Sequence, residues 1–251
     1  MPAVEFRRVS FFASGQLILD NLNLAIEAGE TLVLLGQSGA GKTTALKMVN
    51  GLVFPNSGEV LVDGRATSAW DLIQLRRSIG YVIQDVGLFP HFTVGENIGL
   101  VPRLKKWPPE RTANRTRELL HEMGLAPDEF LERYPRQLSG GQRQRVGVAR
   151  ALAADPRLLL FDEPFGALDP VTRLELQDQF IALRNGLGKT SVFVTHDVRE
   201  ALRIGTRIAL LDRGRLETLA TPEEFLKSPG PQTRAFLAVL DREPRNRSVN
   251  E

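Results

Sequence analysis

The chain has 251 residues, enough for one large α/β domain or two small ones, and its 42% hydrophobic and 25% charged residues are ordinary for a globular protein. The formal net charge is +2, and no block of lysine and arginine indicates a nucleic-acid-binding arm. The absence of cysteine excludes disulfides and thiolate metal sites. The sequence has no run of about 18 apolar residues, so any membrane contact is expected to be made through a partner.

The first third of the chain has the pattern of a parallel-sheet core. Leu17–Ile26 alternates apolar and polar side chains, whereas Thr31–Leu35 is a short apolar run typical of a buried parallel strand. A glycine-rich turn and a helical run follow it. The elements expected here are strands at Val4–Val9, Leu17–Ile26, Thr31–Leu35, Val60–Val62 and Ile79–Ile83, and a helix at Thr43–Asn50.

The middle of the chain has a different character. From Gly87 to about Arg157 the pattern is mostly helical, most clearly in Glu110–Met123. We therefore expect one domain over residues 1–240 with a helical insertion at about 87–157, followed by a polar, disordered tail at 241–251. The later elements expected are strands at Leu158–Phe161, Ser191–Thr195, Ile208–Leu211 and Leu216–Leu219, and a last periodic stretch at Gln232–Leu240.

A phosphate-binding loop is predicted between the strand Thr31–Leu35 and the helix after it, where the sequence GQSGAGKT fits the pattern G-x-x-x-x-G-K-[ST]. Glycines let backbone N–H groups turn towards phosphate oxygens, and the helix N-terminus adds partial positive charge. Lys42 would place a charge on the β- and γ-phosphates and the Thr43 hydroxyl would bind Mg²⁺. The alternative is a glycine-rich turn that only joins a strand to a helix. The expected nucleotide-binding residues are Gly36, Gln37, Ser38, Gly39, Ala40, Gly41, Lys42, Thr43 and Thr44.

Two carboxylates end the apolar strand Leu158–Phe161. An Asp in this place holds Mg²⁺ in P-loop nucleotidases, which is the role expected of Asp162. Glu163, one residue later, can point at a water beside the γ-phosphate. Strand ends are also ordinary places for solvated acids, but the phosphate loop favours the functional interpretation.

A second glycine-rich loop, Leu138–Gln142, precedes the helical run Arg143–Ala154. Its backbone N–H groups and Ser139 could also meet a phosphate, although Ser139 could equally be a simple helix cap. The chain thus has two anion-binding loops but one lysine and one acidic pair suited to them. The simplest explanation is that two copies of the chain share each nucleotide.

In these motifs the chain resembles the ATP-binding cassette (ABC) transporter ATPases, from about Val4 to Leu240, and Leu138–Gln142 matches that family's signature. The resemblance implies an α/β P-loop core with an antiparallel β subdomain and an inserted helical subdomain. It implies that Phe12, or its neighbour Phe11, stacks on adenine, and that Ala167–Asp169 crosses a dimer interface. Gln84 would link Mg²⁺ and water to the insertion, and His196 would contact the γ-phosphate.

The resemblance also implies a shared active site. ATP would lie between two subunits, with Ser139, Gly140, Gly141 and Gln142 supplied by the second copy. The implied roles are catalysis by Glu163, His196 and Lys42, and Mg²⁺ binding by Thr43, Gln84 and Asp162. The implied partners are a second copy, transmembrane permease subunits and, indirectly, a solute-binding protein, at the cytoplasmic face of the cell membrane and without nucleic acid.

The stretch Ile79–Val94 resembles the import ATPases for osmoprotectants such as glycine betaine and choline, and Tyr134-Pro135 and Glu163–Pro170 fit the same group. A permease would dock after Gln84. Apolar side chains there could be its anchors or core residues of the insertion: Leu88, Phe89, Phe92 and Trp107. Since the chain ends at Glu251, the regulatory domain pair of some members of this group is not expected.

Several alternatives stay open at this point. The chain could energise transport of another solute or phospholipid trafficking, which a permease or binding-protein sequence would reveal. A soluble ABC ATPase of DNA maintenance or translation would usually show a long coiled-coil insertion or two cassettes. A P-loop kinase for a small molecule would have no role for Leu138–Gln142.

Overall fold

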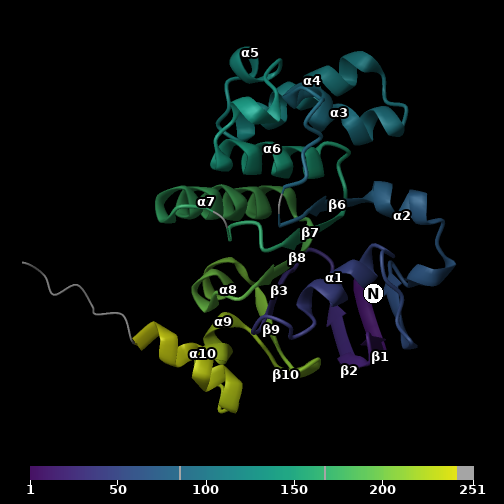
Figure 1. Ribbon diagram of the computed structural model, residues 1–251, viewed down its shortest axis with the longest axis vertical. Coiled ribbons are helices and arrows are strands. Elements are labelled where there is room, and N and C mark those ends of the chain that lie inside the picture. Colours follow the sequence, from purple (N-terminus) through teal and green to yellow (C-terminus); the bar gives the residue numbers. More distant parts are fainter. Residues whose placement is uncertain (85, 167, 242–251) are drawn as a thin grey trace, which may run out of the picture.

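The computed structural model describes residues 1–84, 86–166 and 168–241. Within these residues the strands form two sheets (Figure 1). The smaller sheet is antiparallel, in the order β2-β1-β4-β5, and the larger, in the order β10-β9-β3-β8-β7-β6, is parallel except for the β9–β10 hairpin. The strands are β1 (Val4–Ala13), β2 (Gln16–Ile26), β3 (Thr31–Leu35), β4 (Ser57–Val62), β5 (Arg65–Ala66), β6 (Ile79–Val82), β7 (Leu158–Asp162), β8 (Thr190–Thr195), β9 (Arg207–Asp212) and β10 (Arg215–Ala220).

The parallel strands at the centre of the larger sheet are covered on both faces. Every residue of β3, β7 and β8 is buried, which explains why their sequences are nearly continuous apolar runs. The predicted buried strands are therefore confirmed to within one residue. Because β3, β7 and β8 are parallel neighbours, their carboxyl ends meet at one edge of the sheet.

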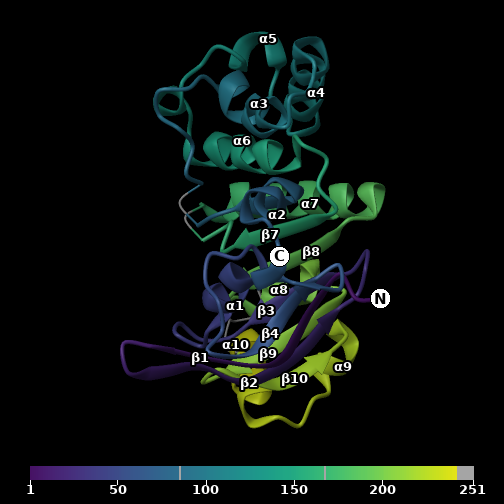
Figure 2. The ribbon, with the colours of Figure 1, turned by 90° about the vertical axis from the view of Figure 1, so that its right-hand side faces the viewer.

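Helices cover the sheets and form a separate lobe at one end of the molecule (Figures 1 and 2). α10 ends at Asp241, and the rest of the predicted tail, 242–251, lies outside the described residues. The helices, including two short 3₁₀ turns, are α1 (Lys42–Val49), η1 (Thr67–Ala69), α2 (Leu72–Ser78), α3 (Val94–Leu104), α4 (Pro109–Glu122), α5 (Pro127–Phe130), η2 (Pro135–Gln137), α6 (Gly140–Leu152), α7 (Pro170–Leu187), α8 (Val198–Ile204), α9 (Pro222–Leu226) and α10 (Pro231–Asp241).

The lobe consists of α3 to α6, where the sequence places a helical insertion between β6 and β7. α3 starts at a capping box of Thr93 and Glu96, and α4 starts with a proline in its first turn. Leu119, Leu120 and Met123 are buried, as their spacing predicts. Among the described residues, none of the helices combines the length with the apolar character that a membrane crossing requires.

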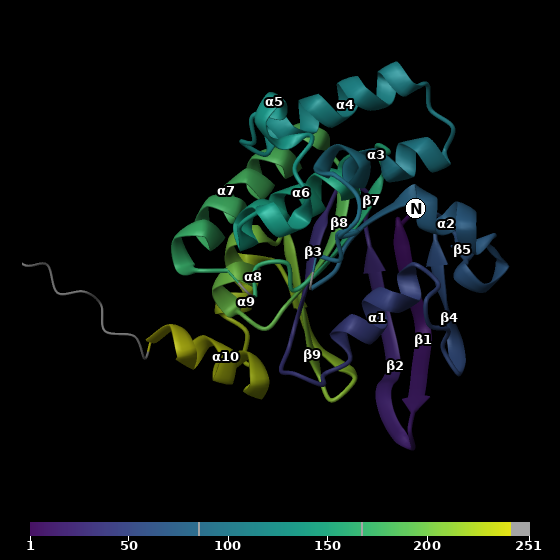
Figure 3. The same ribbon diagram turned by 45° about the horizontal axis from the view of Figure 1, so that its top comes forward.

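The strand β3 separates two hydrophobic cores. Leu32 and Leu34 belong to the core that α1 and the antiparallel sheet form with one face of the larger sheet (Figure 3). Val33 and Leu35 belong to the core on the other face, which continues into the helical lobe. Side chains alternate between the two faces of a strand, so one five-residue segment is packed on both sides.

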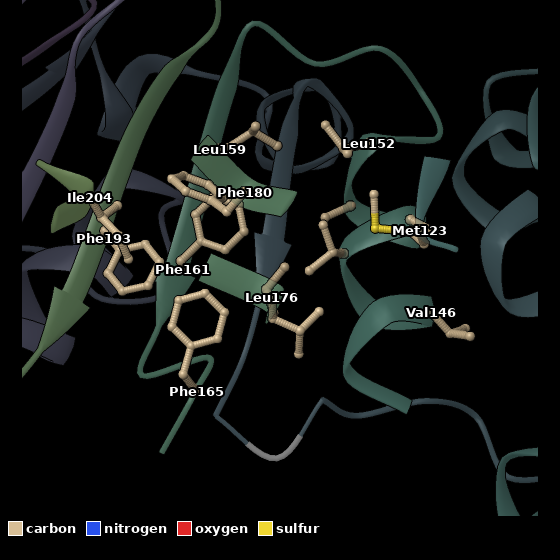
Figure 4. Packing of buried hydrophobic residues seen from close by; sticks show 14 of the residues in the cluster. Met123, Val146, Leu152, Leu159, Phe161, Phe165, Leu176, Phe180, Phe193 and Ile204 are labelled. Carbon is tan, nitrogen blue, oxygen red and sulfur yellow. The ribbon is translucent and has the colours of Figure 1, made fainter. Parts of the chain in front are cut away.

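Aromatic rings support the sheet edge where β7 and β8 end. Phe161 and Phe193 stack with ring centroids 5.6 Å apart, and Phe165 lies 5.4 Å from Phe193. Figure 4 shows these rings in one cluster with Met123 and Val146 of the insertion. Each buried ring stabilises the fold by about 1.5–3 kcal/mol. This packing holds the ends of β7 and β8 in place, and with them the residues that follow Phe161 and Phe193.

Candidate functional site

The loop between β3 and α1 has a backbone that requires glycine. Gly41 adopts a φ of 95° at the N-terminus of α1, and a Cβ atom there would lie 2.7 Å from both the Ile18 carbonyl oxygen and the Leu19 side chain. A Cβ atom at Gly36 would lie 2.5 Å from the carbonyl oxygen of Leu211. The close approach of β2 and β9 thus fixes the shape of this loop.

The Lys42 side chain lies inside the loop. Its ammonium group donates hydrogen bonds to the carbonyl oxygens of Gly36 at 2.8 Å and Gln37 at 2.9 Å, and the residue is only 4% exposed. Burial lowers the pKa of Lys42 from its ordinary value, while the charges of Glu163 and Asp162 act in the opposite direction. A cation is therefore held at the N-terminus of α1, as phosphate binding requires.

Thr43 and Asp162 meet beside this loop. The Thr43 hydroxyl donates to Oδ1 of Asp162 at 2.8 Å, and the Tyr81 hydroxyl lies 3.5 Å from Oδ2. Burial raises the pKa of Asp162, and the Thr43 hydrogen bond lowers it. A hydroxyl and a carboxylate are oxygen ligands of the kind that Mg²⁺ prefers.

No group of three or more His, Cys, Asp or Glu side chains able to hold a metal occurs in the described part of the chain. Mg²⁺ is commonly held by one or two carboxylates together with substrate phosphates. The pair of Thr43 and Asp162 fits that arrangement, because it lies next to the phosphate-binding loop.

Glu163 and His196 come from the ends of neighbouring strands. Oε2 of Glu163 lies 3.1 Å from Nδ1 of His196, whose side chain is 60% exposed. The backbone N–H of Glu163 donates to the Val194 carbonyl oxygen at 3.0 Å, and Glu163 has a φ of 45°. A non-glycine residue in this left-handed region is strained, and such strain is concentrated at functional sites.

Lys42, Thr43, Glu163 and His196 line one cleft with a volume of about 710 Å³, large enough for a cofactor or nucleotide. Gly36 and Asp162 do not line it, but they contact Lys42 and Thr43, which do. The lining residues are Ile18, Gln37, Ser38, Gly39, Ala40, Gly41, Lys42, Thr43, Thr44, Gln84, Glu163, His196 and Phe236.

Two apolar residues of the cleft were not predicted. Ile18 lies on β2, and Phe236 lies on α10, far away along the chain. Neither belongs to a chemical motif, so the sequence carries no signal for them. Phe12, expected to stack on adenine, is 54% exposed on β1 and is not among the lining residues, so its contact with adenine stays a prediction.

The second glycine-rich loop lies at the N-terminus of α6, on the helical lobe. Ser139 caps this helix, with its hydroxyl accepting from the Gln142 N–H at 3.2 Å and its own N–H donating to the Gln142 side chain at 2.9 Å. Ser139 therefore caps the helix, and both Ser139 and Gly140 are exposed. Ser139, Gly140, Gly141 and Gln142 do not line the cleft described above.

Of the loop Ala167–Asp169, Ala167 lies outside the described residues. Asp169 caps α7 by accepting from the Thr172 N–H at 3.0 Å. The side chains after Gln84 divide between core and surface. Leu88 packs against the core, whereas Phe89 is 41% exposed and touches the Phe92 ring at a centroid distance of 5.3 Å.

Trp107 lies apart from that pair, on the loop before α4. The guanidinium group of Arg111 stacks over its ring at 3.7 Å from the centroid. Trp107 is half-buried, and such a contact stabilises an aromatic ring that is only partly covered. Neither interpretation of Trp107, as an anchor or as a core residue, is thereby confirmed.

The family model and the known proteins that are similar to this chain agree with one another. The family described as "ABC transporter" matches residues 19–166. Glycine betaine/carnitine/choline transport ATP-binding protein OpuCA of Bacillus subtilis is 50% identical over 87% of this chain and 57% of its own length. Glycine betaine uptake system ATP-binding protein YehX of Escherichia coli is 49% identical over 90% of this chain and 73% of its own length.

A solved structure shares the fold. The dimeric, post-hydrolysis structure of the ATP-binding cassette MJ0796 with ADP and Pi has a TM-score of 0.79 and 36% identity, covering 87% of this chain and 98% of that one. The chain spans little more than half the length of several curated relatives, OpuCA among them. The matched domain and the P-loop fold agree with the motifs and the cleft, and the chain belongs to the ABC transporter family.

Proposed function

We propose that this chain binds ATP with Mg²⁺ and hydrolyses it. One observation carries the proposal: Lys42, Glu163 and His196 line the same cleft as the glycine-rich loop. A cation for the phosphates, a carboxylate for water and an imidazole paired with that carboxylate are the parts that phosphoryl transfer to water needs.

Each residue has a role that its position supports. Lys42 and the N–H groups at the start of α1 bind the phosphates, and Thr43, Asp162 and Gln84 would hold Mg²⁺. Bound Mg²⁺ neutralises charge on the phosphate oxygens. Glu163 accepts a proton from the attacking water. Glu163 engages Nδ1 of His196, and in this proposal the other ring nitrogen contacts the γ-phosphate.

A second copy of the chain completes the site in this proposal. Ser139, Gly140, Gly141 and Gln142 lie outside the cleft of their own chain, at the exposed N-terminus of α6. They are therefore available to the nucleotide of a partner, and they would close the cleft in a head-to-tail homodimer. Closure with ATP and opening after hydrolysis would supply a two-state element.

We further propose that the dimer energises import of osmoprotectants such as glycine betaine or choline. Support comes from relatives near 50% identity whose names specify transport of these quaternary amines. Phe89, which is exposed and contacts the half-buried Phe92 ring, is a suitable anchor for a permease. The subunit would lie at the cytoplasmic face of the cell membrane, in indirect contact with a solute-binding protein.

The test is purification with the permease subunits from membranes, followed by ATPase assays in vesicles with the binding protein. Stimulation by glycine betaine or choline, but not by sulfate, is the expected result. Stimulation by sulfate alone would reject the substrate assignment and leave the ATPase assignment intact. Absence of ATP hydrolysis in the wild-type complex would reject the ATPase itself.

A further inference from the structure

Three buried polar side chains lie next to the turn that carries His196. They are Thr195 at the end of β8, Glu200 on α8 and Gln177 on α7, and Glu200 is only 6% exposed. A buried carboxyl group is costly unless hydrogen bonds satisfy it. None of the three lines the cleft, so the roles described above leave Glu200 unexplained.

Hydrogen bonds join these groups into one network. The Thr195 hydroxyl donates to Oε2 of Glu200 at 2.6 Å and accepts from the Asp197 N–H at 3.0 Å. Oε1 of Glu200 accepts from the Gln177 amide at 3.3 Å. A hydroxyl has one proton, and donating it to Glu200 leaves its lone pairs for the Asp197 N–H. Glu200 thus sets the orientation of the hydroxyl that closes the turn.

The turn fixes the position of His196. The ring of His196 is mostly exposed, and within the described residues its hydrogen bond is the one to Glu163. Packing therefore restrains the ring little, and its place depends on the backbone between Thr195 and Asp197. Asp197 itself caps α8 by accepting from the Arg199 N–H at 2.8 Å, so the turn is held from both ends.

Arg173 extends the network to another loop. Its guanidinium group donates to the Leu168 carbonyl oxygen at 3.3 Å and lies 3.9 Å from a carboxylate oxygen of Asp197. Leu168 precedes Asp169, the cap of α7. The turn of His196 and the loop before α7 are therefore connected through one side chain.

We propose that Glu200 is a positioning residue for His196. Its carboxyl group, buried between α7 and α8, holds the Thr195 hydroxyl so that the Thr195–Asp197 turn keeps the imidazole in contact with Glu163. The inference rests on the proposed ATP hydrolysis. It adds a residue that touches neither nucleotide nor metal, yet controls the geometry of one that does.

The test compares three variants of the full chain. Glu200→Ala removes the acceptor, Glu200→Gln keeps an acceptor oxygen of the same shape, and Asp178→Ala is a matched control. Asp178 also joins α7 to α8, through Arg203 at 2.5 Å, but it is exposed and, within the described residues, makes no hydrogen bond or ion pair with the turn. The control thus separates the effect of losing a link between α7 and α8 from the effect of losing the hydrogen bonds that hold the turn.

For Glu200→Ala we expect kcat for ATP hydrolysis to fall roughly 10- to 100-fold, as misplacement of a catalytic group by about 1 Å does. The affinity for ATP should stay within about twofold, because the phosphate loop is untouched. Glu200→Gln should restore most of kcat, and Asp178→Ala should keep it. A folded Glu200→Ala protein with wild-type kcat, or an equal fall in Asp178→Ala, would overturn the proposal.

A second substitution covers the case in which Glu200→Ala does not fold. Thr195→Val replaces the hydroxyl with a methyl group of similar size, and it should lower kcat by a similar factor at unchanged ATP affinity. Wild-type kcat in Thr195→Val would also overturn the proposal. Failure of the proposed function can be distinguished from failure of this inference. If the wild-type protein does not hydrolyse ATP, the proposed function is rejected before any variant is made.

Discussion

The Nδ1 atom of His196 lies 3.1 Å from Oε2 of Glu163, so a side-chain contact joins the ends of β8 and β7 at the cleft. The backbone makes the same connection, because the Glu163 N–H donates to the Val194 carbonyl oxygen. Glu163 also has a strained φ of 45°, which the surrounding contacts have to maintain. The two residues therefore form one unit, and a change in either is expected to affect the other.

Glu163→Gln is expected to slow ATP hydrolysis by about 10²–10⁴, the range for removal of a catalytic proton acceptor. The amide keeps the size of the side chain, so ATP binding should survive. Single-turnover hydrolysis and nucleotide binding by the same purified preparation measure the two effects. Glu175→Gln, on the exposed side of α7, is a suitable control. Near wild-type hydrolysis would remove Glu163 from the catalytic role.

Gly41→Ala is expected to destabilise the chain more than Gly15→Ala. Both glycines have a positive φ, 95° and 77°, so both substitutions introduce backbone strain. Only at Gly41 would the new Cβ also collide, 2.7 Å from the Ile18 carbonyl oxygen, whereas the described chain leaves open space at Gly15. The collision should lower the free energy of unfolding by about 1–3 kcal/mol more, as measured in urea. Equal losses would contradict this explanation.

Glu200→Gln is expected to change how stability depends on pH. Burial raises the pKa of Glu200, with Asp197 acting in the same direction and the Thr195 hydrogen bond, Arg173 and His196 in the opposite one. A carboxyl group with a raised pKa binds more protons in the folded than in the unfolded state. Its contribution to stability is present below the unfolded-state pKa and is lost as pH rises through the folded-state pKa.

Glutamine does not titrate, so the variant avoids that loss. The Tm of Glu200→Gln minus that of the wild type should therefore increase as pH rises from the ordinary glutamate range towards neutrality. Thermal unfolding at a series of pH values, with Asp178→Asn as the exposed control, measures this difference. A Tm difference that is constant or falls over the same range would show that Glu200 has no raised pKa.

Phe89→Asp is expected to weaken assembly with the permease while leaving ATP binding intact. Phe89 is 41% exposed and is not among the residues that line the cleft, so a charge there is expected to affect a partner surface more than the fold. Leu226→Asp, at a similarly exposed position on α9, is the matched control. Recovery of permease in affinity purification is the measurement, and equal recovery for both variants would reject Phe89 as an anchor.

The sequence predicts that the candidate site residues lie close together, because they occur at or after the ends of parallel strands. Asp162 ends β7, His196 directly follows β8, and Lys42 follows β3 after one loop. Parallel neighbours bring such strand ends together at one edge of the sheet. Phe236 could not be predicted, because its place in the cleft depends on how α10 packs back against the core. A lone apolar residue in a helical pattern carries no information on that packing.

Glu200 could not be predicted for a different reason. A glutamate in a short helix is ordinarily exposed, so the sequence gives no reason to bury it. Its burial follows from Thr195 and Gln177, which reach it from two other elements. Short helices such as α2 and α9 were also outside the predicted elements, because one or two turns give too little periodicity.

The position of β3 between two cores has a consequence for cooperativity. Leu32 and Leu34 face one core and Val33 and Leu35 face the other, so neither core can melt without exposing this strand. The helical lobe and the sheets should therefore unfold in a single transition. Nucleotide bound at the loop that leaves β3 should raise the midpoint of that whole transition, and not that of one subdomain.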